Sequence, residues 1–139
     1  MRKVMVLIIL AGLAIPSALW AADPAKEKAA TEVALKWLTL VDQGKYAESW
    51  KASSELFRSA ITSKDWEQTL VRASKPLGKL VARKVLSATH TTSVPGAPEG
   101  EYVVVQFETD YENKPKAVET VTPMLEKDGK WRVSGYYIQ

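Results

Sequence analysis

The chain of 139 residues carries 19 lysines and arginines against 16 acidic residues, a formal net charge of +3, and contains no cysteine. The lack of cysteine excludes disulfides, thiolate metal ligands and the lipid-modified N-terminal cysteine of a bacterial lipoprotein. The small charge excess argues against nucleic-acid binding, which requires a large clustered excess of cations. This length suits one domain with a modest core.

The first 21 residues have the layout of a cleaved secretory signal. Two cations precede an uncharged apolar run over residues 4–15, and Pro16 leads into a short segment that ends at Ala21. This order is typical of a signal peptide, and the apolar run is too short for a permanent membrane-spanning helix. We therefore expect cleavage after Ala21 and a single domain over residues 22–139. Its expected location is the periplasm or the medium, without a permanent membrane anchor.

The first half of the remaining chain is predicted to be helical. Apolar residues recur at helical spacing from Ala25 to Gln43, and Gly44 is suited to end that helix. Residues 45–52 are predicted to restart as a short helix. Leu35 lies on the polar side of the first helix, either as a lone exposed leucine or as part of a second packing surface.

Two further helical segments are predicted before the strands begin. Ser53 and Ser54 are good N-cap residues for one or two turns that would bury apolar side chains. Ser63 is predicted to cap a longer helix, which we expect to end at Pro76 and Gly78. The first half of the domain is therefore a set of helices rich in tryptophan.

The second half has the period of β-strands. The predicted strands are residues 79–92, 101–111, 117–126 and 130–138, joined by a Pro- and Gly-rich connection at 93–100 and by short turns. Strands that follow one another through short turns pair antiparallel, so the predicted fold class is α+β. We expect N-terminal helices packed on a curved four-stranded antiparallel meander. Pro123 implies an edge position or a bulge in the third strand.

Several spaced blocks resemble one protein family. They are residues 34–38 with 41–50, residues 76–78 with 83–84, residues 95–104, residues 119–125 and residues 128–138. Together they resemble the bacterial domain-of-unknown-function family 4019, which consists of small exported proteins. The beginning and end of the domain more loosely resemble the nuclear-transport-factor-2-like superfamily. That resemblance implies a cone in which a curved sheet wraps around a long N-terminal helix, but no particular reaction, because this fold hosts both enzymes and binding modules.

The sequence shows no convergent set of catalytic side chains. His90 is the only histidine, so a zinc site or a hydrolase triad would lack its partners. Glu108 and Asp110 share one face of a predicted strand, a spacing that suits paired acid and base roles in glycoside hydrolysis. The same pattern is also the ordinary solvated face of an antiparallel sheet. We predict no catalytic residue, no metal site and no cofactor.

Five residues are the predicted ligand contacts: Trp37, Trp50, Arg83, His90 and Tyr102. The periodicity assigns the tryptophans to the core, where a domain without disulfides needs large apolar anchors. In a cone they would also form part of a pocket wall, and Tyr102 would share that role. His90 lies near the end of the first strand, before the Pro- and Gly-rich connection.

Arg83 has two possible placements. It shares strand parity with Val85, and in that register it points inward, where it needs a carboxylate such as Glu119 or an anionic ligand. In the other register Leu86 and Ala88 point inward and Arg83 is in water. The sequence leaves both registers open.

The expected function is that of an exported, non-catalytic binding or accessory module for a small ligand, a peptide or an envelope protein. One alternative is a cone-fold enzyme that uses Arg83, His90 or the pair of Glu108 and Asp110 for proton transfer. The other is a homodimeric structural or assembly protein that associates through the outer sheet face. A strongly shifted pKa of one of these groups inside a cavity would favour the enzyme. A strictly monomeric mass at high concentration would count against the homodimer.

Overall fold

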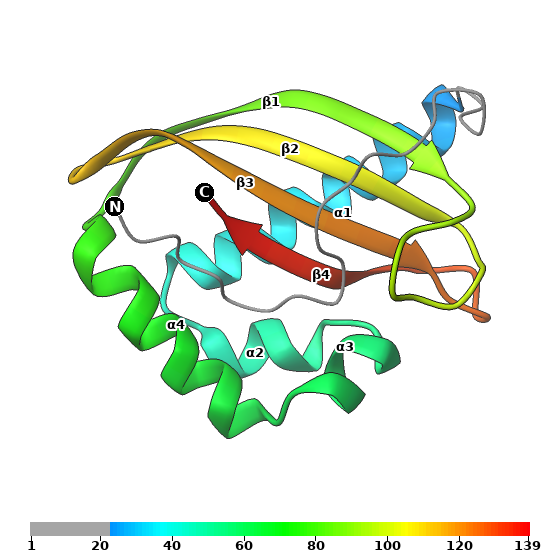
Figure 1. The fold of residues 1–139 in the computed structure, drawn as a ribbon, viewed down its shortest axis with the longest axis horizontal. Helices are drawn as coiled ribbons and strands as arrows, with labels where there is room; N and C mark the ends of the chain where they lie inside the picture. The colour runs from blue at the N-terminus through cyan, green and yellow to red at the C-terminus, as the bar shows by residue number, and fades with distance from the viewer. Residues whose placement is uncertain (1–22) are drawn as a thin grey trace.

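The computed structural model describes residues 23–139, and the predicted signal segment lies outside them. The elements are α1 (Pro24–Asp42), α2 (Tyr46–Lys51), α3 (Glu55–Ala60), α4 (Ser63–Leu77), β1 (Leu80–Thr91), β2 (Tyr102–Tyr111), β3 (Lys114–Leu125) and β4 (Trp131–Ile138) (Figure 1). All neighbouring strands are antiparallel, in the order β1-β2-β3-β4. The prediction of an α+β fold with helices packed on a four-stranded meander is confirmed.

Local signals place most helix ends where the sequence predicts them. Gly44 follows α1 with a φ of 74°, a conformation that favours glycine. The predicted cap of α4 was wrong, because the Thr62 side chain, not that of Ser63, accepts a hydrogen bond from the backbone N–H of Asp65. Both residue types can cap, so the backbone decides between neighbours. Pro76 lies inside the last turn of α4 rather than ending it.

The sheet follows the predicted alternation, with an earlier start for β3. In β2, Val105 and Phe107 are fully buried, whereas Gln106 between them is half-buried on the opposite face. β3 begins at Lys114 rather than at residue 117. Pro123 lies at a register shift of β3 against β4. The extra residue of this bulge is Ser134 on β4, and Pro123 lies opposite it in the interior strand β3, so the second of the two predicted options is present.

Strand β1 changes face at a bulge. Arg83 lies opposite buried Thr109, and Ala88 lies opposite buried Val105. In a regular strand, Arg83 and Ala88 would point to opposite faces, because side chains alternate. A register shift at Leu86 adds one residue and turns both toward the helices. Arg83 thus points inward, as in the first register, and Ala88 points inward, as in the second, but Val85 and Leu86 are 45% and 48% exposed.

The core lies between the sheet and the helices. α1 contacts all four strands, α2 packs between α1 and α4, and α3 contacts β4 (Figure 1). Trp37, Phe57, Trp66 and Tyr136 form an aromatic centre with ring centroids 4.9–6.4 Å apart. Trp37 and Trp66 are buried, and the other two tryptophans of the described residues pack partly exposed against this core. None of the described helices is both long and apolar enough to cross a membrane.

Candidate functional site

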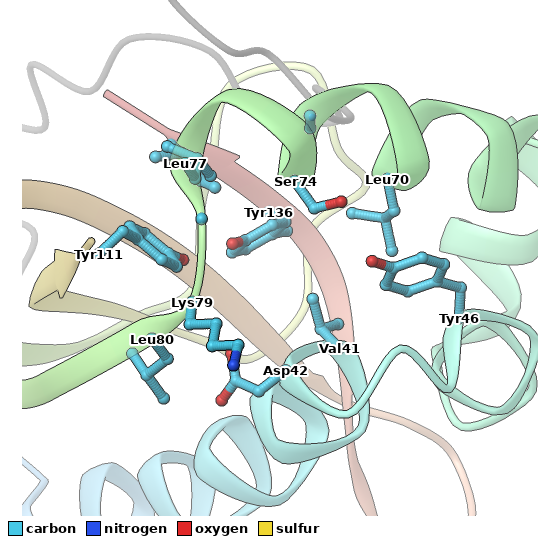
Figure 2. Close-up of a pocket in the computed structure, with 13 residues that line it drawn as sticks. Val41, Asp42, Tyr46, Leu70, Ser74, Leu77, Lys79, Leu80, Tyr111 and Tyr136 are labelled. Carbon is cyan, nitrogen blue, oxygen red and sulfur yellow. The ribbon is translucent and has the colours of Figure 1, made fainter. Parts of the chain in front are cut away.

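A cavity of about 440 Å³ opens between the C-terminal end of α1, helix α4 and the start of β1 (Figure 2). Its apolar walls are formed by Val41, Leu70, Ala73, Leu77, Leu80 and Ile138. Three tyrosines, Tyr46, Tyr111 and Tyr136, contribute rings and hydroxyls. A cavity of this size, with apolar walls and a few polar groups, has the properties of a small-molecule site.

The junction of α4 and β1 holds one wall of the cavity in place. Gly78 turns the chain there with a φ of 75°, and a Cβ at this position would lie 3.0 Å from atoms of Glu112 and Asn113. The backbone N–H of Asn113 donates to the carbonyl of Leu77 at 2.9 Å. Glycine is therefore required both for the turn and for the close approach. This contact fixes the end of β2, and with it Tyr111, beside α4.

A buried polar network centred on Glu119 lies behind the cavity. The fully buried Glu119 carboxylate accepts hydrogen bonds from Arg83 Nε at 2.8 Å, from Thr109 Oγ1 at 2.5 Å and from the Tyr136 hydroxyl. Arg83 also donates two hydrogen bonds to the Asp42 carboxylate, at 2.7 and 3.0 Å. Such a bidentate pair is strong and directional. The predicted pairing of Arg83 with Glu119 is confirmed, and the network ties α1 to all four strands.

The network sets the protonation of its members. Burial raises the pKa of Tyr136 well above its usual value, and the charge of Glu119 raises it further. Burial and Glu119 raise the pKa of Tyr111 in the same way. Burial lowers the pKa of Arg83, but Asp42 and Glu119 raise it above its usual value. Tyr111 and Tyr136 therefore present neutral hydroxyls at physiological pH.

The five predicted ligand contacts fall in separate regions, and none is among the residues that line the cavity. Arg83 comes closest to the predicted role, because it donates a hydrogen bond to Asp42, which lines the cavity. Trp37 and Trp50 belong to the helical core. The indole N–H of Trp37 donates to the carbonyl of Ser49, and that of Trp50 donates to the carbonyl of Ile61. Both tryptophans therefore use their polar atom to hold neighbouring turns.

His90 and Tyr102 lie at the opposite end of β1 and β2. The His90 ring Nε2 is 3.1 Å from a carboxylate oxygen of Glu101, which also pairs with Lys26 on α1. The hydrogen bond from Lys26 lowers the pKa of Glu101. The Tyr102 hydroxyl donates to the carbonyl of Pro98 at 2.6 Å. These contacts close the end of the domain that lies away from the cavity.

The carboxylates considered for catalysis lie on the outer face of the sheet. Glu108 is 3.3 Å from the amine of Lys84, and Asp110 accepts a hydrogen bond from the backbone of Lys116 at 2.7 Å. Neither lines the cavity. Within residues 23–139, no group of three or more histidine and acidic side chains is arranged to hold a metal ion.

The polar lining residues Tyr111, Tyr136 and Asp42 are among the cavity residues that were not predicted as ligand contacts. Tyr111 had a usable signal, because it shares the inner face of β2 with Phe107. Tyr136 is followed by a second tyrosine, so alternation alone does not show which of the two points inward. Asp42 is the last residue of α1, and its position in the helix does not reveal its partner. Its role depends on Arg83, whose orientation the sequence left open.

A family model described as "Protein of unknown function (DUF4019)" matches residues 33–136 of this chain. The chain belongs to that family. No curated protein and no solved structure was found to match it. The cavity and its supporting network lie within the matched segment, except for Ile138. The relation to the nuclear-transport-factor-2-like superfamily stays a prediction.

Proposed function

We propose that this protein is an exported, non-catalytic module that binds a small, largely apolar ligand in the cavity between α1, α4 and β1. The observation that carries this proposal is the cavity itself, whose walls combine six apolar side chains with three tyrosines. Burial of the ligand's apolar surface supplies affinity at roughly 25 cal/mol per Å². The hydroxyl groups fix its orientation.

The polar network supports binding rather than catalysis. Arg83 and Glu119 spend their hydrogen bonds on each other, on Asp42, on Thr109 and on Tyr136, rather than directing them into the cavity. Such a network holds the walls in a fixed arrangement before the ligand arrives. Preorganisation of this kind lowers the entropic cost of binding.

Blocking the cavity tests this proposal. The probe is 1-octanol, and its binding is followed by chemical-shift changes in a nitrogen-15 NMR titration. Ser74 is exposed on α4 and lines the cavity, so Ser74→Trp places a large ring across it. We expect this variant to bind 1-octanol at least about tenfold more weakly, a loss of about 1.4 kcal/mol.

The matched control is Gln68→Trp, which adds the same ring to an exposed position of α4 that does not line the cavity. It should bind 1-octanol as the unmodified protein does. Equal binding by both variants, or shifts scattered away from Leu77 and Tyr111, would contradict the proposal.

Export has its own test. The full chain is expressed in a Gram-negative host, and the protein in the periplasmic fraction is measured by native mass spectrometry. We expect a chain that starts at Ala22, because the preceding segment has the layout of a signal peptide. A full-length chain retained in the cytoplasm would contradict export. The same spectrum reports any ligand that remains bound.

A further inference from the structure

We propose that the cavity selects ligands that join an apolar body to a protonated amine over ligands of the same shape that carry an anionic group. This inference rests on the proposed binding function and names the chemical class of its ligand. It depends on the charges behind the cavity, on the three tyrosines and on the shape of the walls.

The buried network carries one negative charge in excess. A single guanidinium, Arg83, faces two carboxylates, those of Asp42 and Glu119. The side chains of Arg83, Asp42 and Glu119 are 8%, 18% and 0% exposed, so water and salt screen this excess poorly. Asp42 itself lines the cavity, which brings the excess charge to the ligand.

The positive charge among the lining residues comes from Lys79, which is exposed to solvent. An exposed ammonium is screened and contributes little to the field inside a cavity. Lys79 therefore offsets the charge of Asp42 only weakly. A cationic group that enters the cavity loses water on the side that faces Asp42. Its attraction to Asp42 is therefore larger than its repulsion from Lys79.

The tyrosines favour a cation for two reasons. Their hydroxyl oxygens accept hydrogen bonds from an ammonium, and their ring faces attract positive charge. Burial raises the pKa of Tyr111 and Tyr136, and the charge of Glu119 raises it further; the same charge opposes a carboxylate placed against these hydroxyls. Figure 2 shows the hydroxyls of Tyr111 and Tyr136 directed toward one another, with Asp42 on the same cavity.

The remainder of the cavity accommodates the apolar part of the ligand. Leu70 and Leu77 follow one another along α4, and Val41 and Leu80 form walls contributed by α1 and β1 (Figure 2). These four side chains offer no hydrogen bonds, so they suit the apolar part of the ligand. The expected ligand is therefore an amphiphilic amine with its polar group at one end.

Three probes with the same chain test the inference: octylamine, 1-octanol and octanoate. At pH 7.5 the amine is protonated and the carboxylate is ionised. Dissociation constants are measured by NMR titration at low salt. We expect octylamine to bind most tightly, 1-octanol next and octanoate weakest, with at least about a tenfold ratio between the first and the last.

Octanoate binding as tightly as octylamine, or 1-octanol binding more tightly than octylamine, would overturn the inference and leave the proposed binding function standing. Absence of binding in the cavity by all three probes would overturn both.

Substitutions then locate the cause of the selectivity. Asp42→Asn removes the excess charge, so octylamine should lose most of its advantage over 1-octanol when both affinities are measured in the same variant. Lys79→Gln removes the opposing cation on an exposed side chain and should strengthen octylamine binding. Glu108→Gln removes one negative charge on the outer face and should change neither the affinity for octylamine nor that for 1-octanol. An unchanged ratio in Asp42→Asn, or weaker octylamine binding in Lys79→Gln, would contradict the inference.

Discussion

Replacing Glu119 with alanine should lower the free energy of unfolding by about 3–5 kcal/mol. The substitution leaves the guanidinium of Arg83, which is 8% exposed, without its carboxylate on the sheet. It also removes the acceptor for the hydroxyls of Thr109 and Tyr136, both buried. A buried donor without a partner costs about 1–3 kcal/mol, more when it is charged. Urea unfolding followed by tryptophan fluorescence measures the effect.

Two variants separate the causes of that loss. Glu119→Gln keeps the size of the side chain and one acceptor oxygen, so it should cost less than alanine. Glu108→Gln removes a half-buried carboxylate from the outer face and should stay within about 0.5 kcal/mol of the unmodified protein. A Glu119→Ala variant that loses less than about 1 kcal/mol would show that the network contributes little to stability.

Replacing Trp66 with alanine should cost a comparable amount, about 3–5 kcal/mol. Trp66 is fully buried and packs against Trp37, Phe57 and Tyr136. Its indole N–H also donates to the hydroxyl of Ser49 at 2.9 Å. Alanine would leave a cavity where three aromatic rings meet, and these rings come from α1, α3 and β4. Urea unfolding again gives the free-energy difference.

The controls for Trp66 lie at the same position and on the same helix. Trp66→Phe keeps an aromatic ring and loses the hydrogen bond to Ser49, so the expected loss is intermediate. Val71→Ala on the exposed face of α4 should change stability by no more than about 0.5 kcal/mol. If Trp66→Ala were as mild as Val71→Ala, the aromatic centre would not be the main core of the domain.

The fold was predictable because its signals are local. The alternation of Val105, Gln106 and Phe107 marks β2 and its inner face. The change from helical to strand period along the chain indicates the α+β fold class. The cap of α4 and the start of β3 were misplaced because neighbouring residues carry equivalent signals there. Such errors of one to three residues depend on backbone geometry that composition does not determine.

The site was less predictable because its parts are far apart in the sequence. Asp42, Arg83 and Glu119 meet only after α1 has packed on the sheet and β1 has shifted its register. The pairing of Arg83 with Glu119 was available as one of two alternatives, since an inward arginine needs a carboxylate. The large aromatics drew the prediction toward Trp37 and Trp50, whose size equally suits a core.

The bulge at Leu86 also affects how related chains should be aligned. Arg83 and Ala88 reach the same interior only because one extra residue stands between the two halves of β1. A related chain that lacks this residue would pair regularly with β2, and the side chains beyond the deletion would keep their faces, because Val85 and Ser87 already lie opposite neighbouring residues of β2. A one-residue gap in such an alignment therefore belongs at Leu86, because a gap placed elsewhere in β1 would compare buried positions with exposed ones.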